Sequence, residues 1–213
     1  MRDIKELRGA AAALDRDTSI TLLTSHDDRA PEGISRVGGP GFDLGEQQPR
    51  GEEGQAMTHL WTLATADVPA LAKAFPGARA VALYILDPDE NEAWEAFNGM
   101  TALVPLSADD LGRGEAEPTD QDLSPRHVSV EHIEVASSAF VYDPEDQEES
   151  PRRVLRSAIY GASARAGGAP IWLQGDEHEG DFLLQFDESF ANLNLGDCGI
   201  MFVFTDTQFW QCH

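Results

Sequence analysis

The stretch AVALYILD at residues 80–87 is an almost unbroken apolar run that ends at an aspartate. A run of this length without polar alternation is typical of a strand buried on both faces. A second such run, GIMFVFTD, occurs at residues 199–206. Each run is preceded by a further strand-like segment, THLWTL at 58–63 and DFLLQF at 181–186. The same order of elements occurs twice, which predicts an internal duplication.

A glycine-rich element precedes each pair of strands, GGP at 38–40 and GGAP at 167–170. We therefore expect one domain over the whole chain, residues 1–213, built from two similar parts. The predicted parts are two pseudo-repeated halves at about 36–104 and 165–213, joined by an acidic connecting segment at 105–150.

Helical periodicity is confined to short segments. Residues 2–16 have apolar side chains at helical spacing, 66–75 begins near a proline, and 151–164 follows a serine and a proline that suit a helix start. The predicted fold class is therefore α+β, with mostly antiparallel sheets in two pseudo-repeated halves and a few short helices.

The net charge is unusual, because 38 acidic residues face 15 basic ones and give −23 at pH 7. Such a field repels nucleic acid and anionic membranes and attracts cations or a basic partner. Three interpretations remain open: solubility set by the composition of the host, electrostatic steering toward a basic protein, and a cation-dependent enzyme. We expect no nucleic-acid partner and no membrane partner, while the oligomeric state is not predicted.

Much of this charge lies in residues 105–150, which contain 13 acids and two arginines for a local net charge of −11. A solvated loop is one interpretation, and a binding surface for a basic partner is the other. Three stretches are candidates for that surface: 87–95, 109–122 and 143–149. In the densest of them the predicted partner-binding acids are Asp143, Glu145, Asp146, Glu148 and Glu149.

The chain ends in GDCGIMFVFTDTQFWQCH (196–213), which holds both cysteines of the sequence. We expect a hairpin that turns at Asp206-Thr207, with Phe204 opposite Phe209. Cys198 and Cys212 are then offset along the strand pair, too far for one disulfide or one shared metal.

Glutamines are unusual on core strands because a buried amide needs hydrogen-bond partners. The sequence therefore offers one candidate polar pocket, between the halves, while loop anchoring by the glutamines is the alternative. Thr62 stands in the first half where the second has a glutamine. The candidate pocket residues are Trp172, Gln174, Gln185 and Asp197.

No strong catalytic or metal spacing is present. Cys-x-x-Cys, His-Glu-x-x-His, Gly-x-Ser-x-Gly and phosphate-loop patterns do not occur. The acidic loop GDEHEGD (175–181) offers oxygen ligands for a hard cation, although a solvated loop is the more common outcome. We predict no catalytic residues, no metal ligands and no cofactor.

The sequence contains no apolar run of 18 residues, and its charged N-terminal segment does not have the pattern of a secretory signal. Two cysteines do not form a disulfide framework. These features predict a cytoplasmic protein.

Five segments carry a family resemblance: SRVGGPGF (35–42), GGAPIWLQ (167–174), DFLLQFD (181–187), NLGDCGIMFVF (194–204) and FWQCH (209–213). On these segments the chain resembles the YwqG-like family, a bacterial domain of unknown function. The resemblance implies a mixed α+β fold and a bacterial cytoplasmic setting, without established catalytic residues. Members that occur near toxin systems imply an immunity role.

Together these features predict a non-enzymatic, acidic protein-binding module, with neutralisation of a basic toxin as its more specific form. The alternative is a small-molecule- or metal-binding enzyme that uses a cleft between the two halves.

Overall fold

The computed structural model describes residues 8–9, 11–89, 93–145, 147, 150–175 and 178–212. Within these residues ten strands form a single sheet, and every neighbouring pair is antiparallel. The strands are β1 (Thr18–His26), β2 (Arg36–Val37), β3 (Thr58–Ala64), β4 (Ala80–Ile85), β5 (Thr101–Leu106), β6 (Arg126–Val135), β7 (Ala164–Ala166), β8 (Phe182–Asp187), β9 (Ile200–Phe204) and β10 (Gln208–Gln211). Their order across the sheet is β10-β9-β8-β7-β1-β6-β2-β3-β4-β5.

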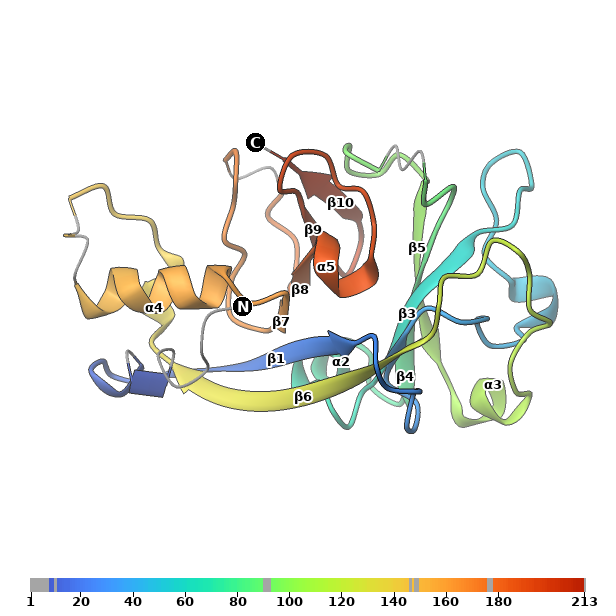
Figure 1. The fold of residues 1–213 in the computed structure, drawn as a ribbon, viewed down its shortest axis with the longest axis horizontal. Coiled ribbons are helices and arrows are strands. Elements are labelled where there is room, and N and C mark those ends of the chain that lie inside the picture. Colours follow the sequence, from blue (N-terminus) through green and yellow to red (C-terminus); the bar gives the residue numbers. More distant parts are fainter. Residues whose placement is uncertain are drawn as a thin grey trace.

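The order of strands is the same on either side of the central pair, β1 and β6. We call β2 to β5 the first module and β7 to β10 the second module. The two long central strands extend between the two ends of the molecule (Figure 1). Although β1 precedes the first module in the chain, it pairs with β7 of the second, and β6 pairs with β2 of the first. The two modules are therefore interlocked through their central strands.

Local irregularities also recur in the two modules. The pairing of β3 with β4 shifts register between His59 and Trp61, and that of β8 with β9 shifts between Phe182 and Leu184. A short helix follows each of these strands, α2 (Pro69–Ala74) after β3 and α5 (Glu188–Ala191) after β8. The register makes Thr62 the counterpart of Gln185, since each pairs with the arginine of the preceding short strand.

The two edge strands, β5 and β10, approach each other and nearly close the sheet into a barrel. The Thr101 hydroxyl on β5 lies 3.2 Å from the Gln208 carbonyl oxygen and 3.1 Å from the side-chain oxygen of the same residue on β10. Near this seam, Trp210 N–H donates to the Ala93 carbonyl at 2.9 Å. Side-chain and loop contacts therefore replace a continuous ladder at the closure.

The predicted α+β fold class is wrong, because the chain forms one nearly closed, barrel-like antiparallel sheet with little helix. Four α-helices lie wholly within the described residues, and all are short: α2, α3 (Ala108–Gly112), α4 (Pro151–Tyr160) and α5. Two 3₁₀ turns, η1 (Gly45–Gln47) and η2 (Ser137–Phe140), add little to the helical content. The physical reason is that loop side chains, such as Phe42 and Trp172, cover much of the outer face of the sheet. Buried strands therefore do not require a layer of helices.

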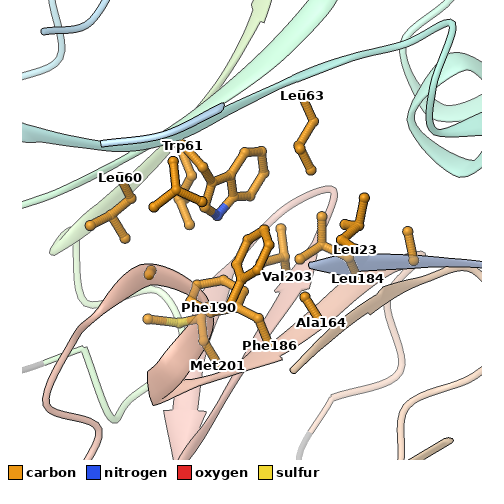
Figure 2. Packing of buried hydrophobic residues seen from close by; sticks show 14 of the residues in the cluster. Leu23, Leu60, Trp61, Leu63, Ala164, Leu184, Phe186, Phe190, Met201 and Val203 are labelled. Carbon is orange, nitrogen blue, oxygen red and sulfur yellow. The ribbon is translucent and has the colours of Figure 1, made fainter. Parts of the chain in front are cut away.

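The inner face of the sheet forms the main core, in which the two modules meet. Figure 2 shows Leu60, Trp61 and Leu63 of β3 facing Phe186 and Val203 of the second module. All five side chains are at most 1% exposed. Full burial of a side chain of this size is worth about 1.5–3 kcal/mol, so this contact holds the modules together.

The outer face carries three further apolar clusters. One lies beneath α4 and includes Ile20, Leu155 and Ile159. The other two occupy equivalent places on β4 and β9, around Tyr84 in the first module and Phe204 in the second. Residues 80–85 and 200–204 are therefore buried along their whole length, as their unbroken apolar runs predict.

Three local expectations need correction. The C-terminal hairpin forms, but Phe209 pairs with Phe202 rather than with Phe204, because the turn lies one residue earlier than predicted. The alternation of residues 126–142 slips near Glu131, which predicts a bulge or a break there, but β6 pairs continuously with β1 through Glu131. Helical structure near the N-terminus ends at residue 12 instead of residue 16, and residues 1–7 and 10 lie outside the described residues.

Candidate functional site

Each module contains a buried arginine two residues before its Gly-Gly element. Arg36 in β2 is 6% exposed, and Arg165 in β7 is 1% exposed. In both, the guanidinium donates to backbone carbonyls of the loop that follows, at Pro40 in the first module and at Gly167 and Ala169 in the second. Each arginine therefore fixes the conformation of its own glycine loop on the outer face of the sheet.

Arg165 is held by neutral partners. Its Nη1 donates to Gly167 at 2.9 Å, and its Nη2 donates to Ala169 and to the Gln185 side-chain oxygen, both at 2.6 Å. The guanidinium carbon also lies 4.9 Å from the centre of the Phe140 ring. Burial lowers the pKa of Arg165 to about 9, so the group stays charged at neutral pH.

Arg36 has a different set of partners. Its Nη1 lies 2.8 Å from the Glu115 carboxylate, which is 54% exposed at the rim. Its guanidinium lies 5.0 Å from the Phe42 ring centre. The first module therefore neutralises its arginine with a partly solvated carboxylate, where the second uses amide and carbonyl dipoles.

Two titratable side chains lie beside Arg36 in the first module. Burial, with a smaller contribution from Arg36, lowers the pKa of His59 to about 4. His59 Nδ1 lies 3.1 Å from the Gly39 carbonyl, which only accepts, so Nδ1 carries the proton and Nε2 accepts from the Thr62 hydroxyl at 2.8 Å. Burial also raises the pKa of Tyr84 to about 12. Both groups are therefore neutral at pH 7.

The glycines are required by close approach as well as by backbone angle. Gly38 has φ +67°, and a Cβ there would lie 2.5 Å from the Ser124 carbonyl oxygen. Gly168 has φ +72°, and a Cβ there would lie 2.4 Å from the Phe140 ring. Any side chain at either position would collide with its neighbour.

The four predicted pocket residues occupy different surroundings. Gln185 is buried, and its oxygen accepts from Arg165 and from the Ile171 backbone N–H. Gln174 is exposed, and its side chain donates to the Cys212 carbonyl at 2.5 Å. Trp172 is half-buried with its ring stacked on Phe202, while Asp197 is exposed. The cavity lined by Trp172 is bordered by none of the other three residues.

Sequence reasoning missed the two arginines and the role of Gln211 in holding a loop. The buried Gln211 oxygen accepts from the Leu173 and Gln174 backbone N–H groups, so this glutamine fixes the loop that carries Trp172. A signal for the arginines was present, since Arg36 and Arg165 both stand two residues before a Gly-Gly pair. An arginine repeated at the same distance from both Gly-Gly pairs indicates a structural role in each loop.

Two of the three acidic stretches meet in one hollow of about 650 Å³ beside β4 and β5. Asp87 and Asp89 come from the first stretch, and Asp120 and Asp122 from the second. Three of them are exposed, while Asp122 is half-buried and accepts two hydrogen bonds from Thr119. We call this feature the acidic hollow; every charged side chain in the described part of its lining is an aspartate.

Asp143 of the third stretch lies beside α4 and does not line the acidic hollow. Asp143 forms an ion pair with Arg152 at 2.7 Å, so part of its charge is used within the chain. Glu145 is exposed. The remaining predicted acids, Asp146, Glu148 and Glu149, lie outside the described residues.

The acidic loop at 175–181 is only partly described, because Asp176 and Glu177 lie outside the described residues. His178 Nε2 lies 2.9 Å from an Asp206 carboxylate oxygen across the C-terminal hairpin. Among the described residues, no three or more His, Cys, Asp or Glu side chains are grouped so as to hold a metal ion. Cys198 and Cys212 are both free thiols.

No protein-family model matches the chain, and no curated protein sequence matches it significantly. The YwqG-like resemblance therefore stays a prediction. None of the helices in the described part of the chain has the length and apolar character needed to cross a membrane. The fold and the two arginine loops define the chain as an antiparallel β-protein with two modules of the same strand order.

Proposed function

We propose that the chain is a non-enzymatic binding protein that recognises a basic protein partner through the acidic hollow. The proposal rests on the meeting of two acidic stretches, separate in the sequence, around one concave surface. The described lining is charged by aspartates alone, so lysine or arginine side chains of a partner would be attracted into it.

The electrostatic argument concerns both the hollow and the whole chain. Like charges around a concavity add, and its low-dielectric walls concentrate their field. The net charge of −23 extends this attraction over the surface and accelerates encounter with a basic protein. Salt screens exposed charges over about 8 Å at physiological ionic strength, so binding should weaken as salt rises. Neutralisation of a basic toxin is the specific form of this activity that we propose.

The alternative predicted from the sequence was an enzyme with a cleft between the halves. It requires the four predicted pocket residues around one cleft. Their separate surroundings offer this alternative no support.

The test measures binding of a fluorescent oligolysine peptide by anisotropy at low and moderate salt. In the hollow variant, Asp87, Asp89, Asp120 and Asp122 are all changed to Asn. Asparagine suits these sites because it preserves side-chain size and tolerates the positive φ of Asp87. We expect binding at least tenfold weaker than that of the unchanged protein at low salt.

A matched control removes the same number of charges from the third acidic stretch, 143–149. It carries Glu145→Gln, Asp146→Asn, Glu148→Gln and Glu149→Gln, and we expect its affinity to fall less than threefold. Equal weakening in the two variants would reduce the effect to net charge alone and would reject the hollow as the binding surface. Capture of a basic protein from host lysate should follow the same order among the three proteins.

A further inference from the structure

A second hollow, of about 400 Å³, lies on the opposite side of the fold from α3, between α4, the segment 141–143 and the loop 171–173. In Figure 1, α4 lies at one end of the long axis and α3 at the other. We call this hollow the arginine–aromatic pocket. It is lined by Val141, Tyr142, Asp143, Arg152, Arg153, Arg156, Ser157, Tyr160, Ile171, Trp172 and Leu173.

The described lining of this pocket is basic, whereas the whole chain is acidic. Among the described residues, three arginines of α4 line it, Arg152 and Arg153 on one turn and Arg156 on the next, and the one carboxylate, Asp143, forms an ion pair with Arg152. The chain has only 15 basic residues in all, so their concentration here stands out against the net charge of −23. An anion inside the pocket would be attracted locally by the arginines, while salt screens exposed acids more than about 8 Å away at physiological ionic strength.

Arg156 is the arginine best placed to receive a ligand. It is half-buried, and its Nη1 donates to the Phe140 carbonyl at 2.7 Å, which fixes the direction of the guanidinium. Its guanidinium carbon lies 5.7 Å from the centre of the Tyr142 ring. A fixed guanidinium loses little conformational freedom on binding, and its planar fork matches carboxylate and phosphate oxygens.

The rest of the lining is apolar and largely aromatic. The Trp172 ring is stacked on Phe202, with centroids 4.8 Å apart, and is therefore held rigidly by the sheet while also lining the pocket. Tyr142 and Val141 are 71% and 62% exposed, which is high for apolar side chains beside a hollow. Such surfaces favour a flat apolar group, because aromatic rings stack at little entropic cost.

We propose that the arginine–aromatic pocket binds a small aromatic anion, that is, a flat ring bearing a carboxylate or a phosphate. The ring would lie against Trp172 and Tyr142, and the anionic group would contact Arg156. The volume suits one small molecule, since ligand pockets commonly measure about 300–1,000 Å³. This binding site does not depend on the acidic hollow or on a protein partner.

The test uses four defined probes in isothermal titration calorimetry: phenyl phosphate, benzoate, benzyl alcohol and inorganic phosphate. The two aromatic anions should bind at least tenfold more tightly than neutral benzyl alcohol, which has the same ring. Phenyl phosphate should also bind at least tenfold more tightly than inorganic phosphate, which has no ring. Comparison of the two aromatic anions distinguishes a phosphate ligand from a carboxylate ligand.

Two variants locate the binding. Arg156→Gln should weaken binding of the aromatic anions at least tenfold, and Tyr142→Ala should weaken it at least threefold. Tyr142 is highly exposed, so its removal leaves the fold intact even if Arg156→Gln proves destabilising. The matched control is Arg113→Gln. Arg113 is an exposed arginine directly after α3, and it also forms an ion pair, with Asp110. The affinity of this variant for the aromatic anions should not change.

The proposal fails if no aromatic anion binds at millimolar concentration, or if benzyl alcohol binds as tightly as benzoate. It also fails if Arg113→Gln weakens binding as much as Arg156→Gln, since the effect would then reflect overall charge. A pocket that instead receives an apolar side chain of another protein would show equal affinity for the neutral and anionic probes, which likewise rejects the proposal.

Discussion

The arginine loops of the two modules share a backbone design and differ in what surrounds the charge. Arg36 has a carboxylate partner, Glu115, which remains half in water. Arg165 is more deeply buried, and it donates hydrogen bonds to backbone carbonyls and to Gln185. The two loops therefore share the guanidinium and the glycines, but different groups balance the positive charge.

The side chains that surround the arginine also differ between the two modules. His59 and Thr62 in the first module occupy the places of Phe182 and Gln185 in the second. The first module therefore has a polar, titratable surrounding, and the second has an aromatic one with a single amide. The predictions below test whether these differences have the energetic consequences that their burial implies.

The largest expected effect is that of Arg165→Met. This change leaves the acceptors of Gly167, Ala169 and Gln185 without their donor in a buried site, which should lower the free energy of unfolding by about 4 kcal/mol. Arg36→Met should cost about 2 kcal/mol, since Glu115 returns to water when its partner is lost. Urea unfolding of both variants measures the difference. A greater cost for Arg36→Met would show that the carboxylate matters more than burial.

The next effect depends on pH and belongs to the first module alone. The pKa of His59 is about 4 when folded and 6.5 when unfolded, so the unfolded chain binds the proton first as pH falls. The stability contribution of neutral His59 is complete above pH 6.5 and decreases as pH falls toward 4, by about 3 kcal/mol in total.

His59→Phe, which copies the second module, should remove this dependence between pH 6.5 and 4. The measurement is the free energy of unfolding of both proteins across that range. Phe182→Leu serves as the control, because it alters the equivalent site without a titratable group. Parallel curves for the unchanged protein and His59→Phe would contradict the assignment.

A smaller difference is expected between the equivalent glycines Gly38 and Gly167. Gly38→Ala places a Cβ 2.5 Å from the Ser124 carbonyl oxygen, whereas Gly167→Ala places one 3.1 Å from the Ser19 oxygen. Both residues have positive φ, which costs an alanine about 1 kcal/mol. Gly38→Ala should cost about 2 kcal/mol more than Gly167→Ala, because backbone must move. Thermal unfolding of the pair tests this order.

The smallest effect is expected for Glu115→Gln. The carboxylate is 54% exposed, and exposed ion pairs contribute about 0.2–1 kcal/mol. The amide oxygen of glutamine still accepts from Arg36, so the loss should be about 0.5 kcal/mol and should shrink in high salt. A loss above 2 kcal/mol would mean that Arg36 depends on a full negative charge, contrary to the comparison with Arg165.

Much of the strand content was predictable because it depends on local composition. The apolar runs at 80–85 and 200–204 are buried strands in equivalent positions of the sheet. The fold class was not predictable from the same runs, since a buried outer face can be covered by helices or by loops. The exchange of β1 and β6 between the modules was also beyond sequence patterns, because partner choice among strands is non-local.

The candidate sites divide in the same way. Acidic stretches are evident in the sequence, but only folding brings 87–89 and 120–122 to one hollow. Trp172 was selected for a pocket with three polar residues, whereas the pocket it lines is made with the arginines of α4. Gln185 and Gln211 are buried on strands, and their side-chain oxygens accept hydrogen bonds from backbone N–H groups of the 171–173 loop.

The sequence by itself determined which segments are buried strands, where the glycine loops lie and how much charge the surface carries. These are properties of residue type and short-range spacing, and hydrophobic burial follows them directly. Only the tertiary structure decided which partner each arginine has, why His59 is neutral and which acids share a hollow. Those outcomes depend on burial and on contacts between distant segments, which exist only once the strands have paired.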